Sequence, residues 1–483
     1  MANTFKPLER SYFTTKDMSK TTTTLLRPKF DVVLASAWIS KRAVFQYVNN
    51  LKAQLKQYKE KGAPSPPAFK LPVSVQVTPV HGSYDYEQPP PSSSQQQNLS
   101  PLSNNSNYCP LEAVDGGEDS LFHTLKYTNL VAAVADGVGG WRDQGVDPSI
   151  FSRTLVSYSK HMVDKSFLLH KSDPIDPKEI MKKAYGQMLL DKLPLTGSST
   201  ELMFSISLVD GNMKVAQLGD STYWILEGGG NARNNRTPID DESGAGSYIT
   251  HKCPEQEHKF NMPYQLSMFD KLMDQIYPSN GESEPISTGY FSPTDDTDVG
   301  GDESVTTRSS WKVTNGQDNS QKPSSKTNLI DSYFDTIKKC GFDTPNHAKL
   351  FNHQLKHNDV VLLGTDGFFD NIFPDEVDSL FDSVLQTKIS DEKTLLQKVK
   401  GFKDSKMLLD TLDKKMMHTL VELLVEKTAT NYLDPNYKSP FAKQSGGMFS
   451  GGKPDDITII LAWIRETDIN ESKAKLNSLS SKL

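Results

Sequence analysis

The sequence predicts a mixed α and β fold, because short apolar runs of strand character alternate with segments of helical periodicity. Residues 130–135, 360–363 and 457–464 are such apolar runs. A helical pattern begins at about Ser149, where one face carries Phe151, Leu155, Tyr158 and Met162. Several of the runs also have acidic residues at one end, so we expect carboxylates at the ends of strands.

The remaining elements follow in chain order. A second helix is expected over 177–190, followed by strands over 202–209, 213–218 and 222–226. Residues 228–247 form a loop rich in Gly, Asn and Asp. Residues 278–327 are rich in Ser, Thr, Gly and Asp and have no apolar period, so we interpret them as a disordered acidic insertion. Structure resumes with the strand 360–363, helices near 375–385 and 408–428, and the strand 457–464.

The first 107 residues differ in composition from the rest. Residues 1–40 are basic and rich in Ser and Thr, which suits a transit peptide, although an ordinary basic tail fits the composition equally well. Residues 41–82 hold an amphipathic helix and an extension, with Val44, Val48, Leu51, Leu55 and Tyr58 at helical spacing. Pro, Ser and Gln make 83–107 a linker. This leaves 108–466 as the main domain and 467–483 as a tail.

Length, charge and cysteine content exclude several protein classes. A chain of 483 residues has room for a large core, but only 36% of it is hydrophobic, so part is expected to remain unpacked. The net charge of −7 argues against a nucleic-acid binder. Cys109, Cys253 and Cys340 predict neither a zinc site nor a disulfide framework, which suits a reducing compartment. The apolar run 32–39 is too short for a transmembrane span.

Five acidic clusters stand beside apolar runs. They are Glu118-Asp119, Asp136-Gly137, Gly219-Asp220, Asp366-Gly367 and Asp455-Asp456. A single Asp-Gly pair after a strand is usually a turn, so the interpretation rests on the set. Carboxylates that converge without histidine or thiolate form an all-oxygen site, which favours Mg²⁺ or Mn²⁺.

In the order and the residue sequence of these clusters, the chain resembles the type 2C metal-dependent Ser/Thr protein phosphatases, and most of all the mitochondrial branch of that family. The branch-like stretches are ADGVGGWRD at 135–143, GVDP at 145–148, GSST at 197–200, HKFNMPYQL at 258–266, DPNYKSPFA at 434–442 and GKPDDIT at 452–458. The resemblance covers roughly residues 105–465, with interruptions.

The resemblance implies an α+β fold in the form of a four-layer α-β-β-α sandwich. Two antiparallel sheets would pack face to face, and helices would cover both outer faces. It also implies hydrolysis of phosphoserine and phosphothreonine in proteins by a water molecule activated between two metal ions, Mn²⁺ or Mg²⁺. A third, weaker metal position is implied as well.

Site residues are carried over one by one. Asp136 would bridge both metals, the Gly137 carbonyl would bind one of them, and Asp366 and Asp455 would bind the second. Glu118 would hold a metal-bound water. Asp119 and Asp220 match acids linked to the third position. Asp456 stands where many members have Asn, so we expect it to support the ligands rather than bind metal. Asp143, Asp370 and Trp141 are interpreted as turn, hydrogen-bonding or packing residues.

One departure concerns phosphate binding. Many family members carry an arginine a few residues before the Glu-Asp element, whereas residues 108–117 contain no basic residue. Arg142, Lys453 or His258 could substitute, or the metals could carry most of the phosphate binding. The proton donor to the leaving group is also unassigned, and His258 and His251 are the candidates.

Two other functions compete with a phosphatase. A pseudo-phosphatase would bind phosphoproteins without turnover, but it need not retain Asp136, Asp366 and Asp455. A two-metal phosphodiesterase is disfavoured because no histidine joins the acidic clusters. The resemblance further implies a mitochondrial protein, in the matrix, that acts on phosphoprotein substrates. We expect a monomer that binds no nucleic acid and has no transmembrane span.

Overall fold

The computed structural model describes residues 28–61, 70–79, 114–169, 174–227, 248–278, 326–396 and 402–466. Residues 1–27 of the transit-like segment, the linker 83–107, the loop 228–247, the tail 467–483 and all but the ends of the insertion 278–327 lie outside the described residues. No helix within these described ranges combines the length and apolar character needed to cross a membrane.

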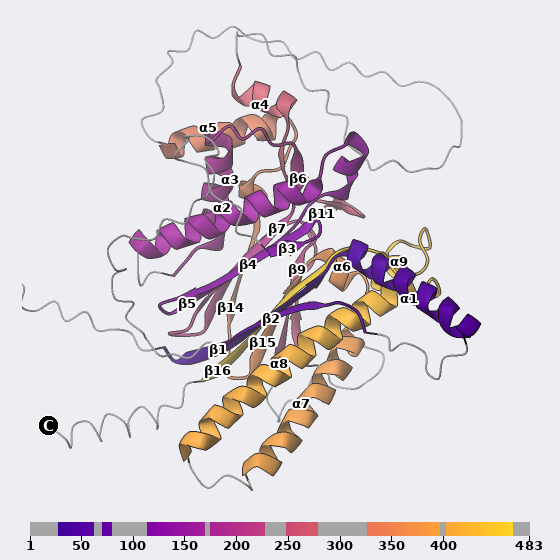
Figure 1. The fold of residues 1–483 in the computed structure, drawn as a ribbon. Coiled ribbons are helices and arrows are strands. Elements are labelled where there is room, and N and C mark those ends of the chain that lie inside the picture. Colours follow the sequence, from indigo (N-terminus) through magenta and orange to yellow (C-terminus); the bar gives the residue numbers. More distant parts are fainter. Residues whose placement is uncertain are drawn as a thin grey trace, which may run out of the picture.

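Two six-stranded sheets form the centre of the fold (Figure 1). Sheet A has the order β10 (Ile249–Lys252), β9 (Thr222–Glu227), β15 (Asp359–Gly364), β16 (Ile457–Glu466), β1 (Phe30–Ile39) and β2 (Ser74–Pro79). Sheet B has the order β14 (Lys349–Gln354), β8 (Asn212–Leu218), β7 (Glu201–Ser207), β5 (Asn129–Asp136), β4 (Asp119–Lys126) and β3 (Val114–Gly116). Neighbouring strands in both sheets are antiparallel.

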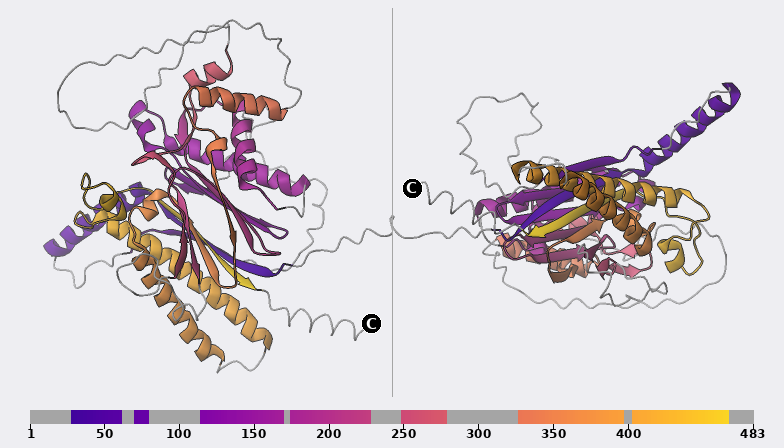
Figure 2. Two further views of the ribbon diagram at one scale, coloured as in Figure 1. Left: turned by 180° about the vertical axis from the view of Figure 1, so that it is seen from behind. Right: turned by 90° about the horizontal axis from the view of Figure 1, so that it is seen from below.

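Helices cover the outer face of each sheet (Figures 1 and 2). On sheet B, α2 (Pro148–Leu169) and α3 (Pro177–Leu190) pack on β4, β5, β7 and β8, with α4 (Asp270–Ile276) and α5 (Lys326–Lys339) beyond them. On sheet A, α8 (Phe402–Leu433) packs on β1, β16 and β2, and α7 (Pro374–Leu396) packs on α8. Two two-stranded sheets complete the fold, β6 (Gly197–Ser199) with β13 (Leu266–Met268) and β11 (Glu257–Lys259) with β12 (Met262–Pro263).

Three apolar layers hold these parts together. Because successive side chains of a strand point to opposite faces, a strand between two layers must be apolar throughout. In β16, Ile457, Ile459 and Leu461 face the α7–α8 layer, whereas Ile460 and Ala462 face sheet B. This explains why 457–464 is an unbroken apolar run. The predicted four-layer sandwich is confirmed.

The first strand corrects the predicted domain boundary. β1 lies inside sheet A between β16 and β2, and it pairs with β16 along all ten of its residues. Val33 and Ala35 contact the α7–α8 layer and Val32 and Leu34 contact the layer between the sheets. The folded domain therefore includes β1 and β2, which lie before the predicted start at 108. The apolar run in 32–39, assigned to the transit-like segment, is a core strand.

The predicted amphipathic helix after this strand is present as α1 (Lys41–Lys61). Val44 is buried against the α7–α8 layer, with Tyr47 and Val48 packed beside it. The hydroxyl of Tyr47 accepts a hydrogen bond from the Lys70 amide at 2.8 Å. Beyond these first turns α1 projects from the body of the protein (Figure 2, right). Its start at Lys41 lies close to the acidic site described next.

Candidate metal centre

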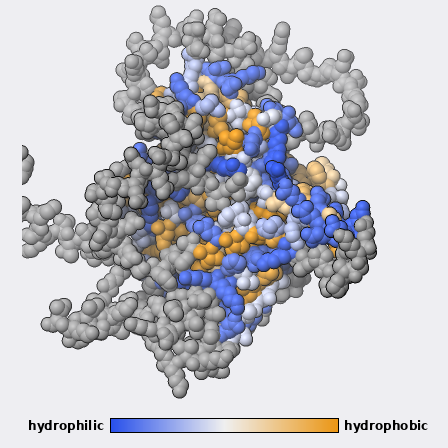
Figure 3. Space-filling view, viewed as in Figure 1, coloured by the Kyte–Doolittle hydropathy of each residue, from blue (hydrophilic) through white to orange (hydrophobic). Residues whose placement is uncertain are grey.

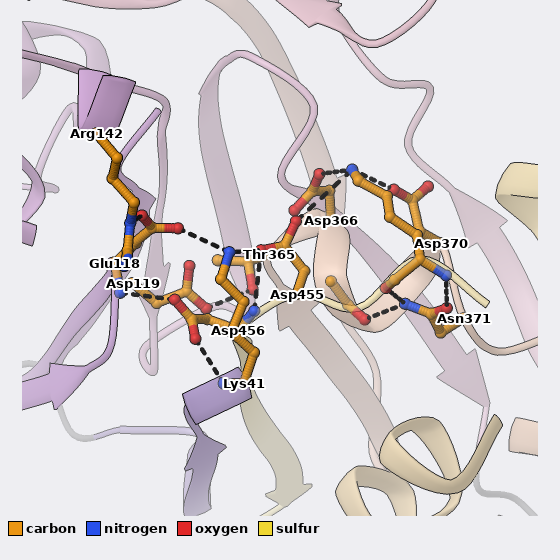
Figure 4. Close-up of polar contacts among 12 residues, drawn as sticks. Lys41, Glu118, Asp119, Arg142, Thr365, Asp366, Asp370, Asn371, Asp455 and Asp456 are labelled. Atoms are coloured by element: carbon orange, nitrogen blue, oxygen red, sulfur yellow. Dashed lines mark hydrogen bonds and ion pairs between the residues drawn. The ribbon is translucent and has the colours of Figure 1, made fainter. Parts of the chain in front are cut away.

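Acidic clusters from both sheets meet at one end of the sandwich, where their strands begin or end. Figure 4 shows three of these clusters together: Glu118-Asp119, Asp366 and Asp455-Asp456. In sheet B, Asp119 at the start of β4 stands opposite Asp136 at the end of β5. In sheet A, β15 runs antiparallel to β16, which brings Asp366 after β15 near Asp455 before β16. Asp366 opens the short helix α6 (Asp366–Phe369). The side chains of Asp366 and Asp136 are within hydrogen-bonding reach, so the two sheets contribute to one site.

Burial and mutual repulsion make this cluster costly without a cation. Burial raises the pKa values of Asp119, Asp136 and Asp220 well above the ordinary range, and neighbouring carboxylates raise them further. Asp220 Oδ1 and Asp366 Oδ1 are buried and receive no hydrogen bond from the described residues. Buried polar atoms of native proteins nearly always have a partner. These oxygens therefore fit a bound hard cation.

A second group of oxygens lies beside the first. Glu118, Asp455 and Asp456 each offer a carboxylate oxygen within 4.8 Å of the others. All the oxygens come from carboxylates, the ligand type that Mg²⁺ and Mn²⁺ prefer. All six predicted acidic site residues are thus gathered at this end of the fold.

Gly137 and Gly367 allow close approach of the main chain in this region. The Gly137 amide donates to the Glu118 carbonyl at 3.1 Å. A Cβ atom at Gly137 would lie 2.5 Å from the Pro148 carbonyl oxygen, and one at Gly367 would lie 2.0 Å from the Asp456 carbonyl oxygen. Neither glycine has a positive φ. Both Asp-Gly pairs therefore need glycine for space and not for turn geometry.

Three basic side chains partly neutralise the cluster. The Lys453 ammonium lies 2.5 Å from Asp366 Oδ2, 2.7 Å from Asp370 Oδ2 and 3.8 Å from Asp455 Oδ2. Although burial by itself lowers the pKa of Lys453, these carboxylates outweigh burial and raise it well above its usual value. Asp370, interpreted from sequence as a turn or hydrogen-bonding residue, holds this lysine.

The other two cations converge on Glu118 (Figure 4). Lys41 Nζ lies 3.0 Å from Glu118 Oε2 and 3.2 Å from Asp455 Oδ1. Arg142 Nε donates to Glu118 Oε1. Burial opposes the charge of Lys41, but the carboxylates of Asp455 and Glu118 outweigh it and raise the pKa of this lysine. Lys41 was missed in the sequence, because it lies 77 residues before Glu118 and in a segment assigned outside the domain. Its position directly after an apolar run was the available signal.

Asp456 supports the main chain that carries these residues. Its Oδ1 accepts a hydrogen bond from the Lys41 amide at 2.7 Å, and its Oδ2 accepts one from the Glu118 amide at 2.7 Å. Both of its oxygens are thus engaged by backbone donors. The sequence predicts a supporting role for Asp456, and these two hydrogen bonds fit that prediction.

Three other candidates from the sequence have partners of their own. His258 Nε2 lies 2.9 Å from Asp343 Oδ2, and the ring stacks on Tyr264 with centroids 3.8 Å apart. His251 packs on His353 across the edge between the two sheets, with centroids 4.4 Å apart. Trp141 donates to Ser198 Oγ at 2.7 Å, as a packing residue beside the site. These contacts favour structural roles for both histidines.

Comparison with known proteins finds relatives that are described as protein phosphatases. No family model matches the chain. The protein phosphatase PTC7 homologs of Homo sapiens and Xenopus laevis are each 27% identical over 353 residues, which cover 72% of this chain and 80% and 82% of theirs. The 5-azacytidine resistance protein azr1 of Schizosaccharomyces pombe is 27% identical over 358 residues, 74% of this chain and 84% of that protein. Among solved structures, the photosystem II phosphatase PBCP covers 72% of this chain at 22% identity, and 92% of its own chain, with a TM-score of 0.41. The chain is thus similar, at 27% identity, to proteins described as protein phosphatase PTC7 homologs.

Proposed function

We propose that this protein is a metal-dependent phosphatase that hydrolyses phosphoserine and phosphothreonine in proteins. The observation that carries the proposal is the group of buried carboxylates, from both sheets, whose unpartnered oxygens need a cation. Homology to protein Ser/Thr phosphatases supports the reaction class. A pseudo-phosphatase that binds phosphoproteins without turnover is the alternative.

The metal ligands in this proposal are the residues gathered at the end of the sandwich. They are Asp136, the Gly137 carbonyl, Asp366 and Asp455 for two Mn²⁺ or Mg²⁺ ions, with Glu118, Asp119 and Asp220 serving a bound water and a third, weaker position. The metals would neutralise the phosphate and lower the pKa of a water molecule. The protein itself supplies the rigid strand ends that hold the carboxylates and the cations that limit their repulsion.

Lys41 is the residue we propose for phosphate binding. Its side chain is 29% exposed, so it can reach a substrate, whereas the Lys453 side chain is 18% exposed and held by Asp366 and Asp370. Substrate binding requires Lys41 only to exchange its contacts with Glu118 and Asp455 for phosphate oxygens. Lys41→Met should raise the KM for a phosphate monoester more than it lowers kcat, and Lys41→Arg should restore part of the loss. An unchanged KM in Lys41→Met would overturn this assignment.

The reaction is tested with metal-stripped protein. It should not hydrolyse p-nitrophenyl phosphate, and manganese or magnesium should restore turnover and raise the melting temperature without any substrate present. Calcium should bind but support little turnover, because its coordination is looser. Turnover of the monoester but not of bis(p-nitrophenyl) phosphate would separate a phosphatase from a phosphodiesterase. Metal binding without turnover of any phosphopeptide would favour the pseudo-phosphatase.

We also propose a mitochondrial location, in the matrix, for a monomeric enzyme. The basic composition of residues 1–27 and the resemblance to the mitochondrial branch support it. A fluorescent fusion of residues 1–27 should enter mitochondria, and a diffuse cytosolic signal would contradict the proposal. Phosphoproteomics of mitochondria with and without this protein would then name its substrates.

A further inference from the structure

Three phenylalanine rings pack together next to the acidic centre, and the exposed Met448 precedes one of them in the chain. We call this surface the aromatic rim; it comprises Phe260, Phe441, Met448 and Phe449. The ring of Phe441 lies 5.0 Å from that of Phe260 and 5.1 Å from that of Phe449, between centroids. Met448 is 72% exposed and Phe449 is 49% exposed. Figure 3 shows pale-orange, apolar surface at this side of the protein, near the position of α9 (Pro440–Gln444).

The local backbone holds the rim in its exposed position. Gly446 and Gly447 have φ values of 64° and 92°, in the left-handed region that favours glycine. Ser445 Oγ accepts a hydrogen bond from the Phe449 amide at 3.0 Å, which fixes the turn. A turn that points two large apolar residues at solvent forgoes their burial energy. Apolar surface of this kind commonly marks an interaction site.

The rim is continuous with the proposed catalytic centre. Lys453 Nζ lies 4.9 Å from the centroid of the Phe441 ring and also contacts Asp366. The Phe441 amide donates to the Asp370 carbonyl at 3.2 Å. Two short contacts therefore separate an aromatic ring from a proposed metal ligand. Successive Cα atoms of a peptide are about 3.8 Å apart, so residues one or two positions from a bound phosphoserine pass over this distance.

We propose that the aromatic rim binds an apolar side chain of the substrate next to the phosphorylated residue. The inference rests on the proposed phosphatase function and names a substrate class for it: phosphoproteins with a Leu, Ile, Met or Phe beside the phosphosite. Charge supports this occupant, because two carboxylates of this region, Glu257 at the start of the hairpin that bears Phe260 and Glu255 just before it, interact electrostatically with Asp366. Acidic neighbours of the phosphosite would be repelled there.

The test uses the full chain loaded with manganese and a double variant, Met448→Ser with Phe449→Ser. Met448 is largely exposed and Phe449 is half-exposed, so the double variant should stay folded and its melting temperature should fall only slightly. Leu350→Ser is the matched control, because Leu350 is an apolar residue that is 53% exposed and lies on β14, the edge strand of sheet B. The substrates are two phosphopeptides that differ only in Leu or Ser beside phosphoserine, together with p-nitrophenyl phosphate.

Wild type and the Leu350→Ser control should prefer the Leu peptide by about tenfold in kcat/KM, equivalent to about 1.4 kcal/mol. The double variant should lose this preference through KM, with p-nitrophenyl phosphate turnover unchanged. An equal preference in the double variant, or no preference in wild type, would overturn the proposal. The proposal would also be overturned if wild type sedimented as a dimer and the double variant as a monomer, because a second copy of the chain would then occupy the rim.

Failure of the proposed function would look different. If no variant hydrolyses p-nitrophenyl phosphate, the fluorescence anisotropy of the two labelled phosphopeptides still measures the rim. Preferential binding of the Leu peptide by wild type but not by the double variant would support the rim even in a pseudo-phosphatase. Equal binding of both peptides by wild type would reject it.

Discussion

Replacing Gly367 with alanine should damage the centre without touching a proposed ligand. Gly367 lies in α6, one residue after Asp366, and its backbone is helical, so alanine meets no conformational penalty there. The obstacle is space: the added Cβ would lie 2.0 Å from the Asp456 carbonyl oxygen and 3.0 Å from the Asp455 Cβ. Because Cβ atoms essentially never have another heavy atom closer than 3.0 Å, α6 and the 455–456 segment must separate by about 1 Å.

That separation moves Asp366 relative to Asp455, which the proposal places on the same metal. A misplacement of about 1 Å can cost roughly a hundredfold in rate. We therefore expect Gly367→Ala to lower kcat/KM for p-nitrophenyl phosphate roughly a hundredfold and to weaken manganese binding, measured by titration of the melting temperature. The carboxylates all remain, so any loss reports their geometry.

Gly140→Ala is the matched control. Gly140 also lies near the centre, in the 3₁₀ segment Gly139–Gln144, but a Cβ there would meet nothing within 4 Å and its φ is not positive. This variant should keep wild-type activity and manganese affinity. Gly367→Ala activity within about threefold of wild type, beside a normal Gly140→Ala, would refute the reasoning, since a hundredfold loss corresponds to about 2.7 kcal/mol.

Three further variants test other parts of the site and core. Asp136→Asn should reduce turnover more than tenfold and lessen the manganese-induced rise in melting temperature. It should not lower the melting temperature of metal-free protein, because it removes repulsion among the acids. If the variant keeps more than about a tenth of wild-type activity, a loss of less than about 1.4 kcal/mol, the bridging role is rejected. The asparagine of Asp456→Asn can accept only one of the two backbone hydrogen bonds that Asp456 accepts. The manganese-loaded variant should therefore lose roughly 1–3 kcal/mol of unfolding free energy in denaturant titrations. A weakened manganese affinity with unchanged stability would instead make Asp456 a ligand. Burial raises the pKa of Glu201 from 4.5 to about 7, so as the pH rises Glu201 loses its proton in the unfolded chain before it does so in the folded protein. The free energy of unfolding should therefore fall by about 3 kcal/mol between pH 4.5 and pH 7. Glu201→Gln should remove that pH dependence, and an identical pH profile for both proteins would contradict the shift.

Most of the sandwich could be predicted because most of its helices and strands have a recognisable local sequence pattern. The helix 177–190 is bounded as predicted: Asp176 caps α3 by accepting from the amides of Lys178 and Glu179. The run 457–464 is apolar on both faces because β16 is buried on both faces. The acidic clusters could be recognised because each follows or precedes such a run, and the strand order then brings them together.

The parts that sequence reasoning missed depend on long-range contacts. The strand β1 is as apolar as β16, but the basic residues before it and the polar stretch after α1 separated it from the domain. Lys41 acquires its place only because β1 pairs with β16 and thereby ends beside Asp455. The partners of His258 and His251, Asp343 and His353, lie 85 and about 100 residues away and likewise cannot be read from a local pattern.

The pairing of β1 with β16 also constrains when this protein can fold. The paired residues, from Phe30 with Glu466 to Ile39 with Ile457, are more than 400 positions apart in the chain. Contacts of such separation make folding slow. Until β16 emerges from the ribosome, β1 offers an open edge and two apolar faces to other chains. Lys41 and Asp455 reach the centre through the same late pairing. Synthesis halted at any point before residue 457 should therefore yield an aggregation-prone chain with no partial activity.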